Sequence, residues 1–207
     1  MSNQITPKQV QQDPSQIATV VHHESIGAIA LRPLVAEDAQ RLGAYLVGLS
    51  EDTRRRYAPH PFDQATADVL CANVDYGDTI RMLATLSPPD APGGQEQVIA
   101  YFILQLSVKD GDRDRYKKLG ITLDSESDCM LAPSVADAFQ DQGVGSLMMA
   151  HLLTVARRLG RKRMVLMGGV RGMNERAIHF YRKHGFRTVG TFDWPAGHLN
   201  YDMILDL

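Results

Sequence analysis

The segment that most constrains the fold of this chain is residues 129–170. It opens with the strand-like stretch CMLAPSVAD and passes through Gly143 and Gly145 into a helical pattern. Apolar residues recur at helical spacing over residues 146–159, and Gly160 is a typical helix stop. The apolar run RMVLMGGV follows, as expected of a strand that is covered on both faces. This order predicts a mixed α/β sheet with helices on its faces.

The rest of the chain supplies further strands and helices. Strands are expected at residues 28–35, 79–87, 98–107, 186–192 and 199–207. Helices are expected at residues 36–50, in the second half of 51–74, and at 174–185, where Asn174 is a plausible N-cap. A turn is expected at residues 88–97, and the charged segment 108–128 is expected to be an exposed loop or a protruding hairpin.

Composition and charge narrow the class of protein. The chain has 207 residues, of which 44% are hydrophobic, and this fits one ordinary domain with an appendage. Residues 1–25 are rich in Gln, Ser and Thr and are expected to be a flexible N-terminal extension of a single domain at residues 26–207. The net charge of -2 gives no reason to expect nucleic acid or an anionic membrane as a partner. No signal peptide, membrane span or metal-ligand spacing of cysteines is visible, which predicts a cytoplasmic protein without a metal.

The two glycines ahead of the long helix raise the question of a phosphate-binding loop. A dinucleotide fingerprint needs a third glycine where this chain has Met148, and a Walker loop needs a Gly-Lys pair that the chain lacks. What remains is Gln140-x-x-Gly143-x-Gly145, with the backbone amides of residues 142–146 free to face an anion at the positive end of the helix. Taken alone, this pattern is more often an ordinary turn.

A second motif about thirty residues later favours the phosphate-binding interpretation. In NERAIHFYRKHGF, Asn174, Tyr181 and Gly185 stand at the spacing Asn-x-x-Ala-x-x-x-Tyr-x-x-x-Gly-Phe. The pair of motifs resembles the GCN5-related N-acetyltransferase (GNAT) superfamily, over roughly residues 29–207 and most strongly over 130–186. The resemblance implies an α/β (α+β) fold of GNAT type: a mixed, mostly antiparallel twisted sheet of six to seven strands with helices on both faces.

The resemblance also implies an activity and a site. The activity is acetyl transfer from acetyl-CoA to a primary amine of a small molecule, a protein lysine or a protein N-terminus, by direct attack on the thioester. Tyr181 is the expected acid that protonates the departing thiolate, with a packed core tyrosine as the alternative. The residues expected to bind acetyl-CoA are Val135, Gln140, Gln142, Gly143, Val144, Gly145, Ser146, Asn174 and Lys183.

The sequence alone does not identify the general base. A protonated amine cannot attack, so a proton acceptor or an already neutral amine is required. In related enzymes a carboxylate on a central strand, or a water held by one, often serves as the base. Asp137 lies near that position, at the strand end where the family commonly has proline. The other candidates are Glu24, His60, Asp193 and His198, and each of them alone is more simply a surface residue.

The acceptor pocket and the alternative functions are also open. Residues 54–57, of sequence RRRY, and the side chains of Trp194, His198 and Tyr201 are candidates for its walls, with a charged helix end and a packed hairpin turn as the plainer interpretations. A non-catalytic sensor or regulatory module that binds CoA or acyl-CoA is the alternative to an enzyme. A homodimer is compatible with the sequence.

Overall fold

The structure is a computed structural model that describes residues 4–87 and 96–207. Most of the turn expected at residues 88–97 lies outside the described residues. The strands are β1 (Thr19–His23), β2 (Gly27–Pro33), β3 (Thr79–Leu86), β4 (Gln97–Gln105), β5 (Asp128–Val135), β6 (Arg163–Leu166), β7 (Val170–Arg171), β8 (Arg187–Asp193) and β9 (Leu199–Asp206). The α-helices are α1 (Pro7–Gln12), α2 (Ala39–Gly48), α3 (Glu51–Arg56), α4 (Gln64–Ala72), α5 (Asp110–Lys118), α6 (Val144–Arg158) and α7 (Glu175–Lys183). Within the described residues, the 3-10 turns are η1 (Pro14–Ile17), η2 (Ala36–Asp38) and η4 (Asp137–Phe139).

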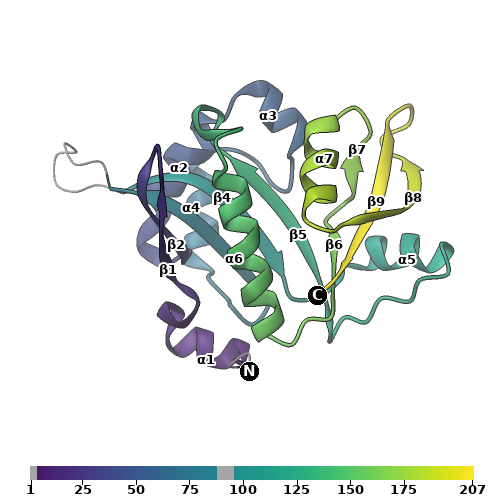
Figure 1. The fold of residues 1–207 in the computed structure, drawn as a ribbon, viewed down its shortest axis with the longest axis horizontal. Coiled ribbons are helices and arrows are strands. Elements are labelled where there is room, and N and C mark those ends of the chain that lie inside the picture. Colours follow the sequence, from purple (N-terminus) through teal and green to yellow (C-terminus); the bar gives the residue numbers. More distant parts are fainter. Residues whose placement is uncertain (1–3, 88–95) are drawn as a thin grey trace.

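The described strands form one twisted sheet in the order β1-β2-β3-β4-β5-β6-β9-β7, with β8 paired to β9 (Figure 1). Only β5 and β6 pair in parallel among these strands, so the expected mixed and mostly antiparallel sheet is confirmed. The sheet has nine strands rather than six to seven. The expected strand at residues 163–170 is divided into β6 and β7, since Gly168 and Gly169 adopt positive φ between them. The N-terminal segment adds β1.

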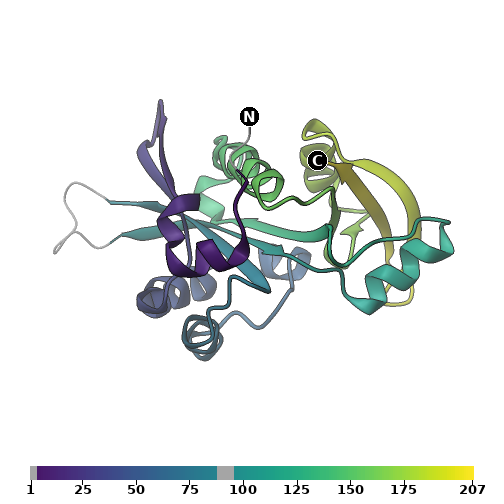
Figure 2. The ribbon, with the colours of Figure 1, turned by 90° about the horizontal axis from the view of Figure 1, so that it is seen from below.

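Helices cover both faces of the sheet (Figure 2). On one face, α6 and α7 pack with the N-terminal segment in the largest hydrophobic cluster. On the other face, α2 and α4 pack over Tyr101 and Ala132, while α5 packs over Met130. Met130 and Ala132 are two residues apart in β5 and therefore share a face of the sheet. Thus α2, α4 and α5 lie opposite α6 and α7.

The N-terminal segment differs from the flexible extension expected for residues 1–25. Its described part forms α1, η1 and β1, and β1 pairs with β2 at the edge of the sheet. Three of its apolar side chains, Ile5, Val10 and Ile17, are buried in the largest cluster. Their spacing of five and seven residues follows neither a helix nor a strand, and so the sequence alone hides them. The segment is a packed part of the fold.

The charged segment at residues 108–128 also differs from expectation, because it contains the helix α5 instead of only a loop or hairpin. Acidic side chains lie in its first turn and basic ones in its last, which complements the helix dipole. Tyr116 is fully buried, and its hydroxyl donates to the carbonyl of Met203 at 2.8 Å. One buried tyrosine is a weak apolar pattern, and it anchors the helix against β9.

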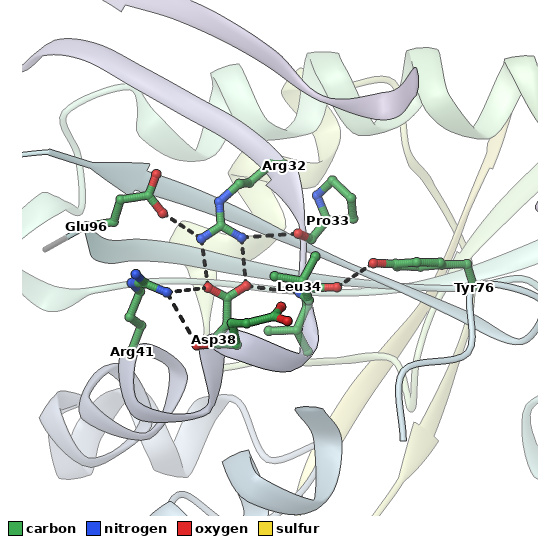
Figure 3. Close-up of polar contacts among 9 residues, drawn as sticks. Arg32, Pro33, Leu34, Asp38, Arg41, Tyr76 and Glu96 are labelled. Atoms are coloured by element: carbon green, nitrogen blue, oxygen red, sulfur yellow. Dashed lines mark hydrogen bonds and ion pairs between the residues drawn. The ribbon is translucent and has the colours of Figure 1, made fainter. Parts of the chain in front are cut away.

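A buried ion pair joins β2 to the start of α2 (Figure 3). The Asp38 side chain is fully buried and accepts from Arg32 at 2.7 and 2.8 Å and from the backbone amide of Val35 at 3.0 Å. Arg32 also bonds Glu96 at 2.6 Å. Burial raises the pKa of Asp38, but the bonds from Arg32 and Val35 outweigh it and hold that pKa below the usual value.

Candidate active site

The parallel strands β5 and β6 separate at Pro133. Their pairing ends with Leu131, which accepts a bond from the amide of Met167 at 2.9 Å. Pro133 is the next residue of β5 on that side, and proline has no N–H to continue the ladder. On the opposite strand the turn at Gly168 and Gly169 carries the chain away. A gap therefore opens in the middle of the sheet.

A cleft of about 740 Å³ occupies this gap. Its walls include residues 131–135 of β5 on one side and residues 167–171 on the other. From the face that carries α6 and α7, it is lined by Gln140, Gly143, Gly145, Ser146, Asn174, Tyr181 and Lys183. From the opposite face, it is lined by Arg55, Arg56, Tyr57, Ala58, Pro59, Lys109 and Asp112. The cleft thus connects the two faces of the sheet.

The last residue of β5 offers a backbone donor to this cleft. In an antiparallel ladder alternate residues bond to one neighbour, and Ala136 donates to the carbonyl of Ile99 at the end of the ladder with β4. The amide of Val135 therefore points the other way, toward the gap. Its carbonyl accepts the side-chain amide of Gln140 at 2.9 Å.

The start of α6 forms a positively polarised end beside the cleft. The first bonds within the helix are donated by Ser146 and Leu147 to the carbonyl of Gly143, at 2.9 and 3.1 Å. The amides of Val144 and Gly145 precede them, so they are free to face an anion. The ammonium of Lys183 on α7 lies 3.3 Å from the hydroxyl of Ser146 and adds a full positive charge.

The two glycines of this loop serve different purposes. Gly143 is the N-cap of α6 with a φ of 89°, which a β-branched side chain cannot adopt without strain. Gly145 has no such backbone requirement, but a Cβ there would lie 3.4 Å from Phe180 and 3.5 Å from Val135. These are ordinary van der Waals distances, so a methyl group fits at Gly145 and only a larger side chain would crowd Phe180, Val135 and the cleft. A substitution at Gly145 probes the site with less backbone strain than one at Gly143.

The structure brings most of the expected cofactor-binding residues to the cleft, and Gln142 and Val144 are the exceptions. The side chain of Val144 is buried in the hydrophobic cluster, although its amide belongs to the first turn of α6. Gln142 is exposed, and its side chain donates to the carbonyl of Ala138 at 2.6 Å. Gln140 lines the cleft, but its side-chain amide is bonded to Val135 and, at 3.2 Å, to Thr53. It fastens the loop to β5 and α3.

Tyr181 and Asn174 both line the cleft from α7 and its N-cap. Asn174 caps the helix through a bond from the amide of Ala177 at 3.2 Å, as its sequence position predicts. Tyr181 is 7% exposed, and burial raises its pKa above the usual value near 10. The phenol therefore keeps its proton throughout the neutral and mildly alkaline range.

The candidate bases from the sequence lie away from the cleft. Asp137 accepts bonds from the amide and hydroxyl of Ser50 and from the hydroxyl of Thr53, at 2.6 to 2.8 Å. Burial raises the pKa of Asp137, but these bonds outweigh it and lower the pKa overall. Asp137 thus fixes the start of α3. None of Glu24, His60, Asp193 and His198 belongs to the described lining either.

The structure places only some of the candidates for the acceptor pocket at the cleft. Arg55, Arg56, Tyr57 and Trp194 line the cleft, whereas His198 and Tyr201 do not belong to its described lining. Arg54 turns back and donates to the carbonyls of Leu46 and Val47 at the end of α2.

Three residues at or next to the cleft were not predicted from the sequence. Asp112 and Lys109 line the cleft from the start of α5, which the sequence suggested to be a loop. His23 of β1 bonds through Nε2 to the carbonyl of Gln142 at 2.6 Å, next to the glycine loop. The amide of Ser25 donates to its Nδ1 at 3.2 Å, and so the bonding network assigns the proton to Nε2. Only the tertiary fold brings these residues to the site.

Comparisons with known proteins agree with this fold. The family model described as the acetyltransferase (GNAT) family matches residues 130–186. The chain therefore carries a segment that matches this family on a GNAT fold, and the resemblance of its two motifs to the GNAT superfamily is confirmed. A search of the curated proteins finds no match for the chain.

Several solved structures share the fold. The GNAT domain of S. lividans PAT has a TM-score of 0.68 at 20% identity, covering 94% of this chain and 99% of its own. A GNAT-family acetyltransferase from Streptococcus pneumoniae has a TM-score of 0.63 at 19% identity, covering 86% and 99%. Arabidopsis thaliana NAA60, solved in complex with acetyl-CoA, has a TM-score of 0.61 at 16% identity, covering 86% and 98%.

Within residues 4–87 and 96–207, three or more His, Cys, Asp or Glu side chains nowhere gather as a metal-binding group. Across the same ranges, no helix is long and apolar enough to span a bilayer.

Proposed function

We propose that this chain is an acetyl-CoA-dependent N-acetyltransferase that acts on a primary amine of a small molecule, a protein lysine or a protein N-terminus. The observation that carries the proposal is the gap at Pro133, which joins an anion-binding helix start and a protonated tyrosine in one cleft. A thioester that enters from the side of α6 can meet an amine that enters from the side of α3 and α5.

The residues of the α6 face fit acetyl-CoA. Its diphosphate pairs with the free amides of Val144 and Gly145 and with the ammonium of Lys183. The amide of Val135 donates to the pantetheine arm or to the thioester oxygen, where negative charge develops as the amine attacks. Asn174 has its side-chain oxygen engaged in the helix cap, so its side-chain NH2 is the group offered to the cofactor.

Tyr181 supplies a proton donor for the departing thiolate. The amine nitrogen forms a bond to the acetyl carbon and gives up a proton, the carbon–sulfur bond breaks, and the sulfur takes up a proton. A phenol with a pKa near or above 10 carries its proton at neutral pH, so the hydroxyl of Tyr181 is available to donate to that sulfur. Loss of activity on the acidic side then reflects protonation of the attacking amine, whose unperturbed pKa is about 10 for a lysine and about 8 for a protein N-terminus.

Binding is tested by calorimetry with acetyl-CoA on the wild type and on Gly145→Val. We expect the larger side chain to weaken acetyl-CoA binding at least tenfold, as it occupies the space between Phe180 and Val135. Gly48→Val is the matched control, because Gly48 ends α2 and a Cβ there meets no atom within 4 Å. Equal affinity of a folded Gly145→Val variant and the wild type would contradict the proposed cofactor site.

Turnover is tested by release of free thiol from acetyl-CoA with a panel of primary amines. Tyr181→Phe is expected to lower kcat by about 10²-fold or more and to leave acetyl-CoA affinity unchanged. Tyr201→Phe, outside the described cleft lining, is the control. An unchanged kcat for Tyr181→Phe would remove the acid role. Binding of acetyl-CoA without turnover of any amine would favour the sensor or regulatory module.

A further inference from the structure

Asp112 is a buried carboxylate at the cleft that the mechanism above does not use. It lies in the first turn of α5, is 5% exposed, and lines the cleft from the face opposite α6 and α7. Its Oδ1 accepts the amide of Gly168 at 3.1 Å and a bond from Arg115. Both bonds end on Oδ1, so Oδ2 has no partner among residues 4–87 and 96–207. Asp112 is therefore held in place, and its Oδ2 is available to a ligand.

The surroundings of Asp112 leave its charge incompletely balanced. Arg115 also bonds Asp202, at 3.0 Å, and Asp202 is 1% exposed. Two buried carboxylates therefore share one guanidinium, and the group carries a net negative charge when both are ionised. Such a charge is stabilised by a further cation. Since Asp112 alone of the two carboxylates lines the cleft, that cation is best placed in the cleft.

Asp112 is the carboxylate of the acceptor half of the cleft. The described lining contains two carboxylates, Asp112 and Asp141. Asp141 belongs to the loop before α6, is 75% exposed at its side chain, and pairs with Arg176 at 3.3 Å. It lies with the residues proposed to bind acetyl-CoA. A cationic group that enters from the α5 side meets Asp112.

Three cations line the same half of the cleft. Lys109 precedes α5 by one residue and forms no ion pair with any described residue. Arg55 and Arg56 lie at the end of α3 and pair with Glu51 at 3.9 Å and Asp52 at 3.0 Å within their own helix. Exposed pairs of this kind contribute little, about 0–1 kcal/mol, so both guanidinium groups can turn to a ligand.

We propose that this half of the cleft binds a primary amine that also carries an anionic group, such as a carboxylate or a phosphate. Asp112 accepts the N–H bonds of the amine, while Lys109 and Arg56 attract the anionic group. The inference rests on the proposed function and names the class of acceptor for the same cleft. The bound ammonium first gives one proton to Oδ2 of Asp112 and so becomes the neutral nucleophile. When the nitrogen then attacks the thioester carbon and the carbon–sulfur bond breaks, the nitrogen loses a second proton, which replaces the one that Tyr181 gives to the sulfur.

The experiment uses ω-amino carboxylates of two to six carbons, each matched with an alkylamine and a diamine of equal length. Thermal shift is measured with and without CoA, and thiol release from acetyl-CoA gives KM and kcat. We expect at least one amino carboxylate to raise the Tm of the wild type and to have a KM about tenfold below that of its matched alkylamine.

The variants test separately the contact of Asp112 with the amine and the contact of Lys109 with the anionic group. Asp112→Asn keeps an acceptor for Gly168 but removes the proton acceptor, so it is expected to raise KM at least tenfold and to lower kcat for every amine in the panel, with acetyl-CoA affinity unchanged. Lys109→Met is expected to reduce the preference for the amino carboxylates, since Arg56 remains, and to leave KM for the alkylamines unchanged. Asp110→Asn and Lys117→Met, both on α5 and outside the described lining, are the matched controls and are expected to behave as the wild type.

The inference is overturned if alkylamines or diamines bind as well as the amino carboxylates, if Asp112→Asn binds the panel as the wild type does, or if no amino carboxylate raises the Tm. Failure of the proposed function has a different signature, namely no acetyl-CoA binding in calorimetry. The thermal shifts without CoA report on the Asp112 site in that case as well.

Discussion

One side chain, that of His23, holds the glycine loop at the start of α6. His23 reaches the loop from β1, 119 residues away in the sequence, and donates to the carbonyl of Gln142. That bond lies next to Gly143, whose positive φ sets the direction of the amides in the first turn. The N-terminal hairpin therefore positions a loop to which it is not connected in sequence.

His23→Ala is expected to weaken acetyl-CoA binding about 3- to 10-fold, since a neutral hydrogen bond contributes about 0.5–1.5 kcal/mol. His22→Ala is the matched control, because the adjacent histidine is exposed on the other side of the strand. Calorimetry with acetyl-CoA on both variants measures the effect. Equal affinities for the two variants would show that His23 does not position the loop.

For single residues, the sequence predicted which of them lie at the cleft better than it predicted their contacts. The two motifs placed Gly143, Gly145 and Asn174 at the cleft, because local spacing fixes which residues begin a helix. The same reasoning assigned Gln140 to the pyrophosphate, whereas its side chain is bonded to Val135 and Thr53. Contacts such as these depend on the packing of separate elements, which spacing along the chain does not encode.

At the scale of elements, the connection between β2 and α2 depends on the buried Asp38. Its carboxylate is shared by Arg32, the amide of Val35 and Arg41. The bonds fix the angle at which the chain leaves the sheet and enters α2, and α2 in turn precedes the α3 wall of the cleft.

Asp38→Ala is expected to lower the free energy of unfolding by about 3 kcal/mol, because it leaves Arg32 without its main partner. Asp206→Ala, which removes the exposed pair with Arg187, is the control and is expected to cost less than about 1 kcal/mol. Urea unfolding at neutral pH measures both. A loss for Asp38→Ala no greater than that of the control would contradict this account of the connection.

Asp38 also makes the free energy of unfolding depend on pH in the acid range. The pKa of Asp38 is lower in the folded state, so its stabilising effect is present above its unfolded pKa of about 4 and is lost as the pH falls through the folded value. The difference in stability between the wild type and Asp38→Ala should therefore shrink below about pH 4.

Elements with strong periodicity were predicted from the sequence, and those that depend on packing were not. The helix at residues 146–159 is α6, and its buried side chains repeat at helical spacing. By contrast, α5 buries mainly Tyr116 and Asp112, so its charged sequence resembles that of a loop. The break between β6 and β7 follows from two glycines inside an apolar run, which periodicity alone does not distinguish from one continuous strand.

At the scale of the whole molecule, buried phenols make stability depend on alkaline pH. Burial raises the pKa of Tyr76 and of Tyr101 to about 12, and it raises the pKa values of the other buried tyrosines as well. A raised folded pKa contributes stability that is complete below the unfolded value of about 10 and is lost as the pH rises through the folded value. Each such group lowers the free energy of unfolding by about 1.4 kcal/mol per pH unit in that window.

The free energy of unfolding is therefore expected to be lost steeply between about pH 10 and 12. The thiols of Cys71 and Cys129 have pKa values raised by burial, with Cys71 at about 11, so the decline begins near pH 9. Urea unfolding at successive pH values, with tyrosinate absorbance recorded on the folded protein, measures it. A constant free energy of unfolding up to pH 11 would contradict the burial of these groups.

The central claim about the whole molecule is that the gap at Pro133 holds acetyl-CoA with its diphosphate at the start of α6. The most direct measurement is a titration of the isotope-labelled protein with acetyl-CoA, followed through its backbone amide NMR signals. The account predicts that the largest shifts occur at Val135 and at residues 143–146. Unmoved signals there, with the largest shifts in β1, α4 or the far end of α6, would contradict it.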